Sequence, residues 1–483
     1  MLDVLVRNGS VVFPNRGVVK TDIGINGGKI SQIGSSRATT AKTVIDATGK
    51  HVFPGLIDSH FHVGIYRPLD IDAKSESASA VAGGVTSILS YFRSGKNYLN
   101  SAAPYSELFK KVLDLSSGNF YCDYGYHLAP VTATHLLEIR ELVKKFGVST
   151  FKFYMFYRGL VLKGEFRKGA VEREYLLSED PYDLGHLSKM MSTVSEINKT
   201  TSPVRVSVHA EDAELIRINI EETKTKKKLN PLEAYNEARP PESERLALVQ
   251  AIELAMQTHC PVNILHVSSG LALQTIKELR LANPDLDVMV EVTVHHLMLN
   301  DKYNPSVFGK VNPPIRTDSD QESLWNGIQR GDVNTVASDH ACITRAEKGK
   351  DIWSAEPGFG GTELLLPSLI TGGYFARKIP LESLASLVTL NPAKFHGLSH
   401  VKGDIVVGLD GDLAIVDMKK KMTVDHKKMH SAQDFSPFDG IELAGWAETT
   451  ILRGKVVFNQ GKVVGKCEGN YLERPASSRA GRS

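Results

Sequence analysis

Between residues 53 and 398 the chain alternates between short apolar runs and longer helical segments, and this alternation constrains its fold more than any other feature. Val85–Tyr91 precedes the helical segment Tyr105–Leu115, and Thr150–Tyr154 precedes Leu184–Ile197. Alternation of this kind places parallel strands in one sheet and helices on its outer face. Over a segment of this length it predicts an α/β protein built on a (β/α)8 barrel of the TIM type.

The two ends of the chain have a different texture, with short strand-like runs separated by glycine-rich turns. This pattern fills residues 1–52 and returns in residues 399–470, where Asp404–Val407 is one of the expected strands. Neither end alone is long enough to bury a core. We therefore expect both ends to fold together into one small β-sandwich beside the barrel, and residues 471–483 to form a flexible tail.

Composition excludes several classes of partner. Lys and Arg number 57 and Asp and Glu number 55, so the formal charge is +2, which argues against binding to nucleic acid or to a membrane surface. No apolar run reaches the roughly 18 to 20 residues that a membrane span needs, and no signal peptide is evident. The four cysteines form no C-x-x-C pair, which favours a reducing compartment. We expect a cytoplasmic protein.

The first candidate ligands are His60 and His62, which end the apolar segment HVFPGLIDSHFHV over residues 51–63. Side chains two residues apart on a strand point to the same side, so the two imidazoles converge. Two neutral imidazoles at the end of a strand form half of a metal site. A strand with two ordinary inward-facing histidines has the same pattern, so the interpretation depends on ligands elsewhere.

Lys152 lies in the segment FGVSTFKFYMFY, among apolar and aromatic neighbours. Burial disfavours the charged form of lysine and leaves a nucleophilic neutral amine. Such an amine can take up carbon dioxide to form a carbamate, an anionic ligand with two oxygens that is able to bridge two metal ions. The alternative is a lysine whose aliphatic stem crosses the core to reach a carboxylate at the surface.

Three more candidates each close a short apolar run further along the chain. His209 follows VRVSV, His266 follows VNIL and Asp339 follows NTVAS. Active sites of α/β barrels collect their residues at these C-terminal strand ends. Each residue alone also fits a purely structural role, as a core histidine or as the aspartate that caps the N-terminus of a helix. One shared metal centre explains all of these positions together.

In this order the residues resemble those of the binuclear amidohydrolase superfamily, in its cyclic amidase branch of dihydropyrimidinases or hydantoinases, allantoinases and dihydroorotases. The resemblance runs from about residue 1 to residue 470 and rests on several segments jointly. These are VFPGLIDSHFH, FGVSTFKFYMFY, VHAE, ARPPESE, LHVSS, KVNPPIR, ASDH, TLNPAKFHGL and KGDIVVGLDGDLAIVD.

The resemblance implies two divalent metal ions, expected to be zinc, with cobalt or manganese as alternatives. One ion would be held by His60, His62 and Asp339, and the other by His209 and His266. Lys152, modified to N6-carboxylysine by carbon dioxide, would bridge the two ions together with a hydroxide.

The implied reaction is attack of this hydroxide on the carbonyl carbon of a cyclic amide. Asp339 would take the proton of the nucleophile and deliver it to the leaving nitrogen, which gives a ring-opened product. The expected activity is that of a hydantoinase or dihydropyrimidinase. Alternatives are an allantoinase, a hydrolase of another cyclic imide or lactam, and a dihydroorotase-like enzyme. A non-catalytic relative and a mononuclear deaminase fit less well, because all the ligand positions are filled. The family also implies a homo-oligomer, a tetramer or a dimer.

The same resemblance assigns substrate contacts. Tyr157 would contact the substrate and donate to the oxyanion, while Asn312 and the loop at Pro357 and Gly358 would hold the ring. Dihydroorotases usually carry an arginine two residues after the H-x-H pair, which grips the substrate carboxylate. Gly64 stands at that position here, so a carboxylate clamp would need a different arginine: Arg67 or Arg93.

Overall fold

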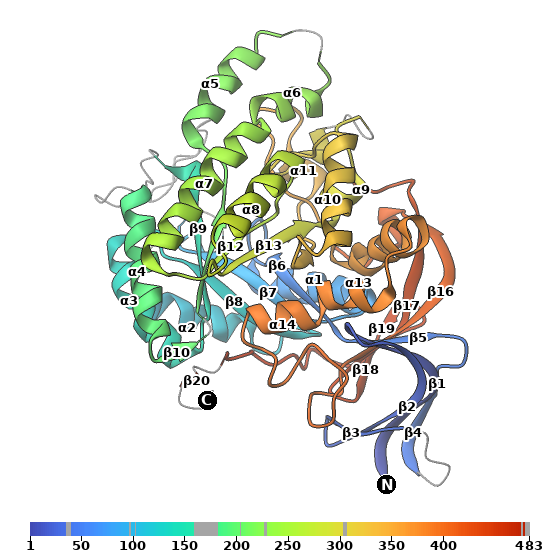
Figure 1. Cartoon of the computed structure of the whole chain (residues 1–483). Coiled ribbons are helices and arrows are strands. Elements are labelled where there is room, and N and C mark those ends of the chain that lie inside the picture. The colour runs from blue at the N-terminus through green and yellow to red at the C-terminus, as the bar shows by residue number, and fades with distance from the viewer. Residues whose placement is uncertain are drawn as a thin grey trace.

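A computed structural model of the chain describes residues 1–34, 40–95, 98–101, 103–158, 182–202, 204–226, 229–302, 307–474 and 477–478. Its centre is a barrel of parallel strands enclosed by helices (Figure 1). Residues of the central strands are buried on both faces, as expected for a parallel sheet covered by helices. In chain order the strands are β6 (Leu56–His62), β7 (Val85–Arg93), β8 (Asp123–Ala129), β9 (Thr150–Tyr154), β11 (Arg205–His209), β12 (Val262–Ile264), β13 (Val288–Thr293), β14 (Thr335–Ala337) and β15 (His340–Ala341).

The last two strands close the barrel. β14 pairs in parallel with β13, whereas β15, two residues further on, pairs in parallel with β6. The segment 335–341 therefore acts as one broken strand that joins the two edges of the sheet, with Asp339 at the break. The predicted (β/α)8 barrel is confirmed.

Helices pack around the outside of the barrel and return the chain from one strand to the next (Figure 1). They are α1 (Leu69–Ala82), α2 (Tyr105–Ser116), α3 (Ala133–Phe146), α4 (Leu184–Asn198), α7 (Pro241–Thr258), α8 (Gly270–Ala282), α10 (Asp318–Arg330), α13 (Leu381–Val388) and α14 (Leu390–Phe395). Further helices lie in the connections: α5 (Ala213–Thr223), α6 (Pro231–Ala238), α9 (Val294–Met298), α11 (Arg345–Lys348) and α12 (Leu365–Ser368).

Local sequence accounts for the helix ends. The hydroxyl of Thr132 accepts a hydrogen bond from the backbone of the first turn of α3, and Thr317 caps α10 in the same way. In the segment ARPPESE, Pro241 occupies the first turn of α7, where its missing N–H costs nothing. Gly147 and Gly331 end α3 and α10 in the left-handed conformation, which glycine adopts without strain.

The two ends of the chain form a second sheet, which lies at one side of the barrel (Figure 1). It contains β1 (Leu2–Phe13), β2 (Gly17–Asn26), β3 (Lys29–Ile33), β4 (Ala41–Asp46), β5 (His51–Pro54), β16 (Leu413–Thr423), β17 (Glu442–Leu452), β18 (Lys455–Asn459) and β19 (Lys462–Val463). β5 pairs with β16, and one buried cluster joins Val6 and Ile25 to Leu413 and Ile451. Neither end has this core without the other.

One expected strand is wrong. Residues Asp404–Val407 are irregular, because the chain turns at Gly403 and Gly408, both of which have positive φ. Ile405 still enters the core of the small domain, which explains why the segment is apolar.

The end of the chain returns to the barrel. Tyr471 donates a hydrogen bond to the carbonyl of Phe146, and the backbone of Arg474 donates to the carbonyl of Gly147. Residues 477–478 form β20 (Ser477–Ser478), which pairs with β10 (Thr201–Ser202). The rest of the expected tail lies outside the described residues. Among the described helices, none combines the length and the apolar character needed to cross a membrane.

Candidate active site

The six predicted ligands meet at one end of the barrel. His60 and His62 end β6, Lys152 lies in β9 and His209 ends β11, while His266 and Asp339 follow β12 and β14. All six residues are buried, and the most exposed of them, His62, is 9% exposed. Because the strands are parallel, their C-terminal ends share one edge of the barrel, and residues far apart in sequence converge there.

His60, His62 and Asp339 form a compact group whose ligand atoms lie within 4.8 Å of one another. The Oδ1 atom of Asp339 lies 3.1 Å from Nε2 of His60 and 3.1 Å from Nε2 of His62. Asp339 has a positive φ of 51°, a conformation that side chains rarely adopt and that is often found at functional sites. The backbone there places its carboxylate between the two imidazoles.

His209 and His266 form a second group beside the first. Their ring centroids are 4.3 Å apart, and the ring of His266 lies 5.4 Å from that of His60. Neither ring nitrogen of His266 has a hydrogen-bond partner among the described residues. A buried polar atom without a partner is costly, so the lone pair of His266 is suited to a ligand supplied from outside the chain.

Lys152 lies between the two groups. Its Nζ atom is 3.1 Å from Nε2 of His60 and lies over the ring of Tyr91, 4.0 Å from the centroid. The neighbouring Tyr154 ring is 4.7 Å away. This amine therefore faces imidazole and aromatic groups at the centre of the cluster.

Burial sets the protonation of the cluster. Loss of hydration lowers the pKa of His60 to about 3 and those of His62 and His209 to about 4, and it also lowers the pKa of His266. Burial lowers the pKa of Lys152 to about 8 as well. At neutral pH the imidazoles are neutral and keep the lone pairs that metal coordination requires.

Two carboxylates orient the histidines from behind, and they were not among the predicted residues. Glu291 in β13 lies 2.6 Å from Nδ1 of His60, and Glu211 lies 2.6 Å from Nε2 of His209. Burial raises the pKa of Glu211, but the guanidinium of Arg239 and the histidine outweigh burial and lower it to about 2. The signals were in the sequence: Glu211 is in VHAE, Glu291 opens EVTVHHL and Arg239 is in ARPPESE.

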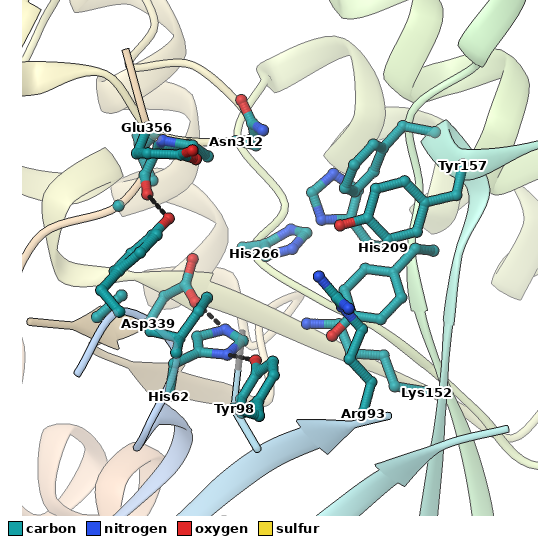
Figure 2. Close-up of a pocket in the computed structure, with 18 residues that line it drawn as sticks. His62, Arg93, Tyr98, Lys152, Tyr157, His209, His266, Asn312, Asp339 and Glu356 are labelled. Atoms are coloured by element: carbon teal, nitrogen blue, oxygen red, sulfur yellow. Dashed lines mark hydrogen bonds and ion pairs between the residues drawn. The ribbon is translucent and has the colours of Figure 1, made fainter. Parts of the chain in front are cut away.

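A cavity opens above the cluster, and all the predicted substrate-contacting residues line it: Tyr157, Asn312, Pro357 and Gly358. Figure 2 shows the hydroxyl of Tyr157 pointing into the cavity, with Asn312 on the opposite wall. Tyr157 ends the short 3-10 helix η1 (Met155–Tyr157), which directly follows β9. The same strand therefore positions Lys152 and Tyr157.

The loop at Pro357 and Gly358 lines the cavity with its backbone polar groups already paired. The backbone N–H of Gly358 donates to the carbonyl of Lys310, and the hydroxyl of Tyr66 donates to the carbonyl of Pro357, 2.6 Å away. Proline has no N–H to offer. These residues shape the wall, and their backbone groups serve the loop itself.

Arg67 and Arg93, the two arginines considered for a carboxylate clamp, are placed differently. Arg93 ends β7 and lines the cavity. Arg67 is absent from the cavity lining; its Nη1 atom lies 3.6 Å from carboxylate oxygens of both Asp72 and Glu76.

Comparison with known proteins identifies relatives that match almost the whole chain. Residues 241–458 match the model of the amidohydrolase family. The chain is 30% identical to an allantoinase of Deinococcus radiodurans over 99% of both chains. It is 29% identical to a D-hydantoinase of Ralstonia pickettii, over 98% of this chain and 99% of that one.

Solved structures with similar folds include the dihydropyrimidinase of Brevibacillus agri. It has a TM-score of 0.86 and 25% sequence identity, and the match covers 99% of this chain and 100% of that one. An L-hydantoinase of Arthrobacter aurescens matches with a TM-score of 0.83 and 26% identity, over 98% of this chain and 99% of the other. Both the barrel and the small domain lie within the matched length.

Proposed function

The chain belongs to the amidohydrolase superfamily, in its cyclic amidase branch, and from this membership we propose that it is a metal-dependent hydrolase that opens cyclic amides of the hydantoin or dihydropyrimidine type. One observation carries the proposal: neutral imidazoles, a carboxylate and a lysine from five strands of the barrel converge beneath a single cavity. An allantoinase is the second candidate, because the relative from Deinococcus radiodurans has that activity by name.

The residues present fit a pair of divalent ions. His60, His62 and Asp339 offer three ligand atoms close together, and His266 has two unpaired ring nitrogens next to His209. Lys152, carboxylated by carbon dioxide, would supply the anionic ligand between the two groups. Histidine and carboxylate ligands suit zinc, and they also suit cobalt or manganese.

When bound, such ions lower the pKa of water and polarise an amide carbonyl. The rest of the chemistry falls to the chain. Asp339 has an oxygen within 3.1 Å of two imidazoles and lines the cavity, so it can receive the proton of the attacking water. It can then release that proton to the ring nitrogen, which becomes the leaving group when the C–N bond breaks. The leaving nitrogen stays tethered, because the substrate is a ring.

The cavity walls supply the remaining functions. The hydroxyl of Tyr157 points toward the interior and would donate a hydrogen bond to the carbonyl oxygen as negative charge develops there (Figure 2). Asn312 would hold the ring, while Pro357 and Gly358 would pack against it and keep bulk water out.

We also propose that the protein works in the cytoplasm as a dimer or tetramer. The four cysteines are free thiols, which suits a reducing compartment. Light scattering on the purified protein tests the oligomer: a mass of two or four chains supports it, and a monomer at micromolar concentration contradicts it.

A substrate panel tests the function. Protein prepared with zinc and bicarbonate is assayed for ring opening with dihydrouracil, hydantoin, allantoin and dihydroorotate. We expect turnover of at least one of these rings, lost after chelation and restored by zinc. Preference for allantoin above the other rings would favour the second candidate. If the zinc-loaded protein opened none of the four, the proposal would be wrong.

A further inference from the structure

A buried arginine near the end of the chain, Arg474, lies at the end of the barrel opposite the candidate active site. Its Nε atom donates a hydrogen bond to the carbonyl of Gly147, 3.1 Å away, and Nη2 donates to the carbonyl of Tyr126 in β8. Gly147 lies in the connection from α3 to β9, so the guanidinium is beside the N-terminal ends of the strands. Arg474 is 2% exposed, and a guanidinium stays protonated, so a permanent positive charge is enclosed there.

This charge has no counter-charge among the described residues. The hydrogen bonds of Arg474 are made with backbone carbonyls, and none of the described carboxylates forms an ion pair with it. By contrast Arg205, a second buried arginine at this end of the barrel, lies 2.8 Å from the carboxylate of Asp287. A buried charge without a partner is strongly unfavourable. Water could accept hydrogen bonds from Arg474, but only an anion would also compensate its charge.

Hydrogen-bond donors without acceptors lie beside the guanidinium. Nη1 of Arg474 has no hydrogen-bond partner, and neither has Nε2 of His396, the residue that ends α14. Nδ1 of His396 lies 3.3 Å from the hydroxyl of Thr150, which can donate to it and leave the ring proton on Nε2. The ring nitrogens of His127 in β8 also lack partners. Buried polar atoms are rarely left unpaired, so these donors are suited to an acceptor from outside the chain.

The three side chains lie close together. The two imidazole rings have their centroids 4.8 Å apart. A Cβ atom added to Gly125 would lie 2.5 Å from Nη1 of Arg474, and His127 is two residues further along the same strand, on the same face. Burial is the main cause that lowers the pKa of both histidines, to about 3 for His396, and the charge of Arg474 lowers both further. Both rings are therefore neutral at neutral pH, and each can donate one N–H.

We propose that Arg474, His396 and His127 form a binding site for a small inorganic anion inside the closed end of the barrel, with chloride as its occupant. The guanidinium supplies the charge and the two N–H groups of Nη1, and each imidazole supplies one more donor. A halide accepts hydrogen bonds from any direction, which suits donors that come from three separate segments. None of the three residues is more than 2% exposed, which excludes a large organic anion. The site is independent of the proposed reaction.

Diffraction from crystals grown with sodium bromide tests the site without any variant. Bromide can replace chloride, and its anomalous scattering distinguishes it from water. We expect one anomalous peak within hydrogen-bonding distance of both Nη1 of Arg474 and Nε2 of His396. A planar oxyanion at that position that bromide does not displace would support the anion site and identify bicarbonate as its occupant. Ordered water alone beside Arg474, with bromide confined to the protein surface, would overturn the proposal.

Thermal unfolding at constant ionic strength tests the site in solution. Replacing sodium gluconate, whose anion is too large for the site, with sodium chloride should raise the Tm of the wild-type protein by about 2 to 4 °C. Arg474→Met removes the charge but keeps much of the side-chain length. The chloride-dependent rise should be lost in this variant, whatever its Tm in gluconate. Arg474→Lys keeps the charge without the fork, and it should retain part of the rise.

Arg280→Met is the matched control. The guanidinium of Arg280 also donates to backbone carbonyls, those of Asp332 and Val288, but this residue is only partly buried and solvent can screen its charge. We expect Arg280→Met to keep the full chloride-dependent rise in Tm. An equal rise in the wild-type protein and in Arg474→Met, or loss of the rise in Arg280→Met as well, would mean that chloride acts elsewhere and would contradict the proposed site.

Discussion

Lys152 and Lys402 are both buried, being 1% and 3% exposed, but their surroundings differ in kind. Lys402 lies at the opposite end of the barrel, where its Nζ atom contacts three carboxylates: Asp123 at 2.5 Å, Asp410 at 2.9 Å and Asp412 at 2.5 Å. Lys152 instead faces His60 and the rings of two tyrosines.

The two environments act on the amines in opposite directions. Burial alone would lower both pKa values, but the carboxylates outweigh it and raise the pKa of Lys402, whereas that of Lys152 falls to about 8. The aspartates around Lys402 have the spacing of a metal site, but an ammonium fills it. Two clusters of similar spacing thus differ in their cation. The aspartate cluster contains the ammonium of Lys402 and joins the barrel to the small domain. The histidine cluster includes the two unpaired ring nitrogens of His266, which can bind a cation from outside the chain.

The largest expected effect on metal content and turnover comes from replacing Lys152. In Lys152→Ala we expect loss of bound metal and turnover below detection, because the anionic ligand between the two histidine groups is gone. Elemental analysis and the ring-opening assay measure both effects. Propionate at high concentration should restore part of the activity by filling the vacated space with a carboxylate. If Lys152→Ala kept its metal and full activity, Lys152 would not be a ligand of the metal centre.

Lys402 should show the reverse behaviour. In Lys402→Met three buried carboxylates lose their shared cation, and we expect a destabilisation of about 3 to 5 kcal/mol, typical of a broken buried ion pair. Chemical denaturation measures this change. Metal content and kcat/KM of the folded protein should stay at wild-type values, and a loss of metal without a loss of stability would contradict the structural role.

The carboxylates behind the histidines give a smaller effect. Glu211→Gln and Glu291→Gln keep the side-chain shape but weaken the orientation of His209 and His60, and we expect metal affinity to fall by about 10- to 100-fold. Competition with a chromophoric chelator measures the affinity. Glu363→Gln is the matched control, because Glu363 is a buried carboxylate that pairs with His430, away from the cluster. An equal loss of metal affinity in Glu363→Gln would argue against a specific role of Glu211 and Glu291 in orienting the histidines.

The smallest effect comes from His430 itself. Its hydrogen bond to Glu363, 2.9 Å long, is the main cause that raises the pKa of this histidine. A raised histidine pKa stabilises the fold fully below the ordinary value of 6.5, and the contribution is lost as pH rises through the raised pKa. The difference in unfolding free energy between wild type and His430→Asn should be below about 1 kcal/mol. It should shrink as pH rises above the ordinary value of 6.5; an increase would contradict the assignment.

Periodicity predicted the barrel and the ligand positions because strand ends are local features. The predicted strand Thr150–Tyr154 coincides with β9, and each candidate ligand lies within two residues of a strand's end. The predicted strand at Asp404–Val407 was wrong, because apolar residues also occur in irregular segments. The Lys402 cluster could not be predicted from the sequence, because its carboxylates come from residues 123, 410 and 412 and only the tertiary fold brings them together. Glu211 and Glu291 were not predicted, because the sequence alone does not show which carboxylates lie beside a histidine in the folded chain.

The metal content of the wild-type protein, located by anomalous scattering, tests the comparison between the two clusters most directly. Crystals of protein prepared with zinc and bicarbonate should show about two zinc ions per chain among His60, His62, Lys152, His209, His266 and Asp339, by the bridging-ligand argument. The Asp123, Asp410 and Asp412 cluster should show none, because Lys402 occupies it. Absence of zinc from the histidine cluster, or zinc in the aspartate cluster instead, would contradict the account.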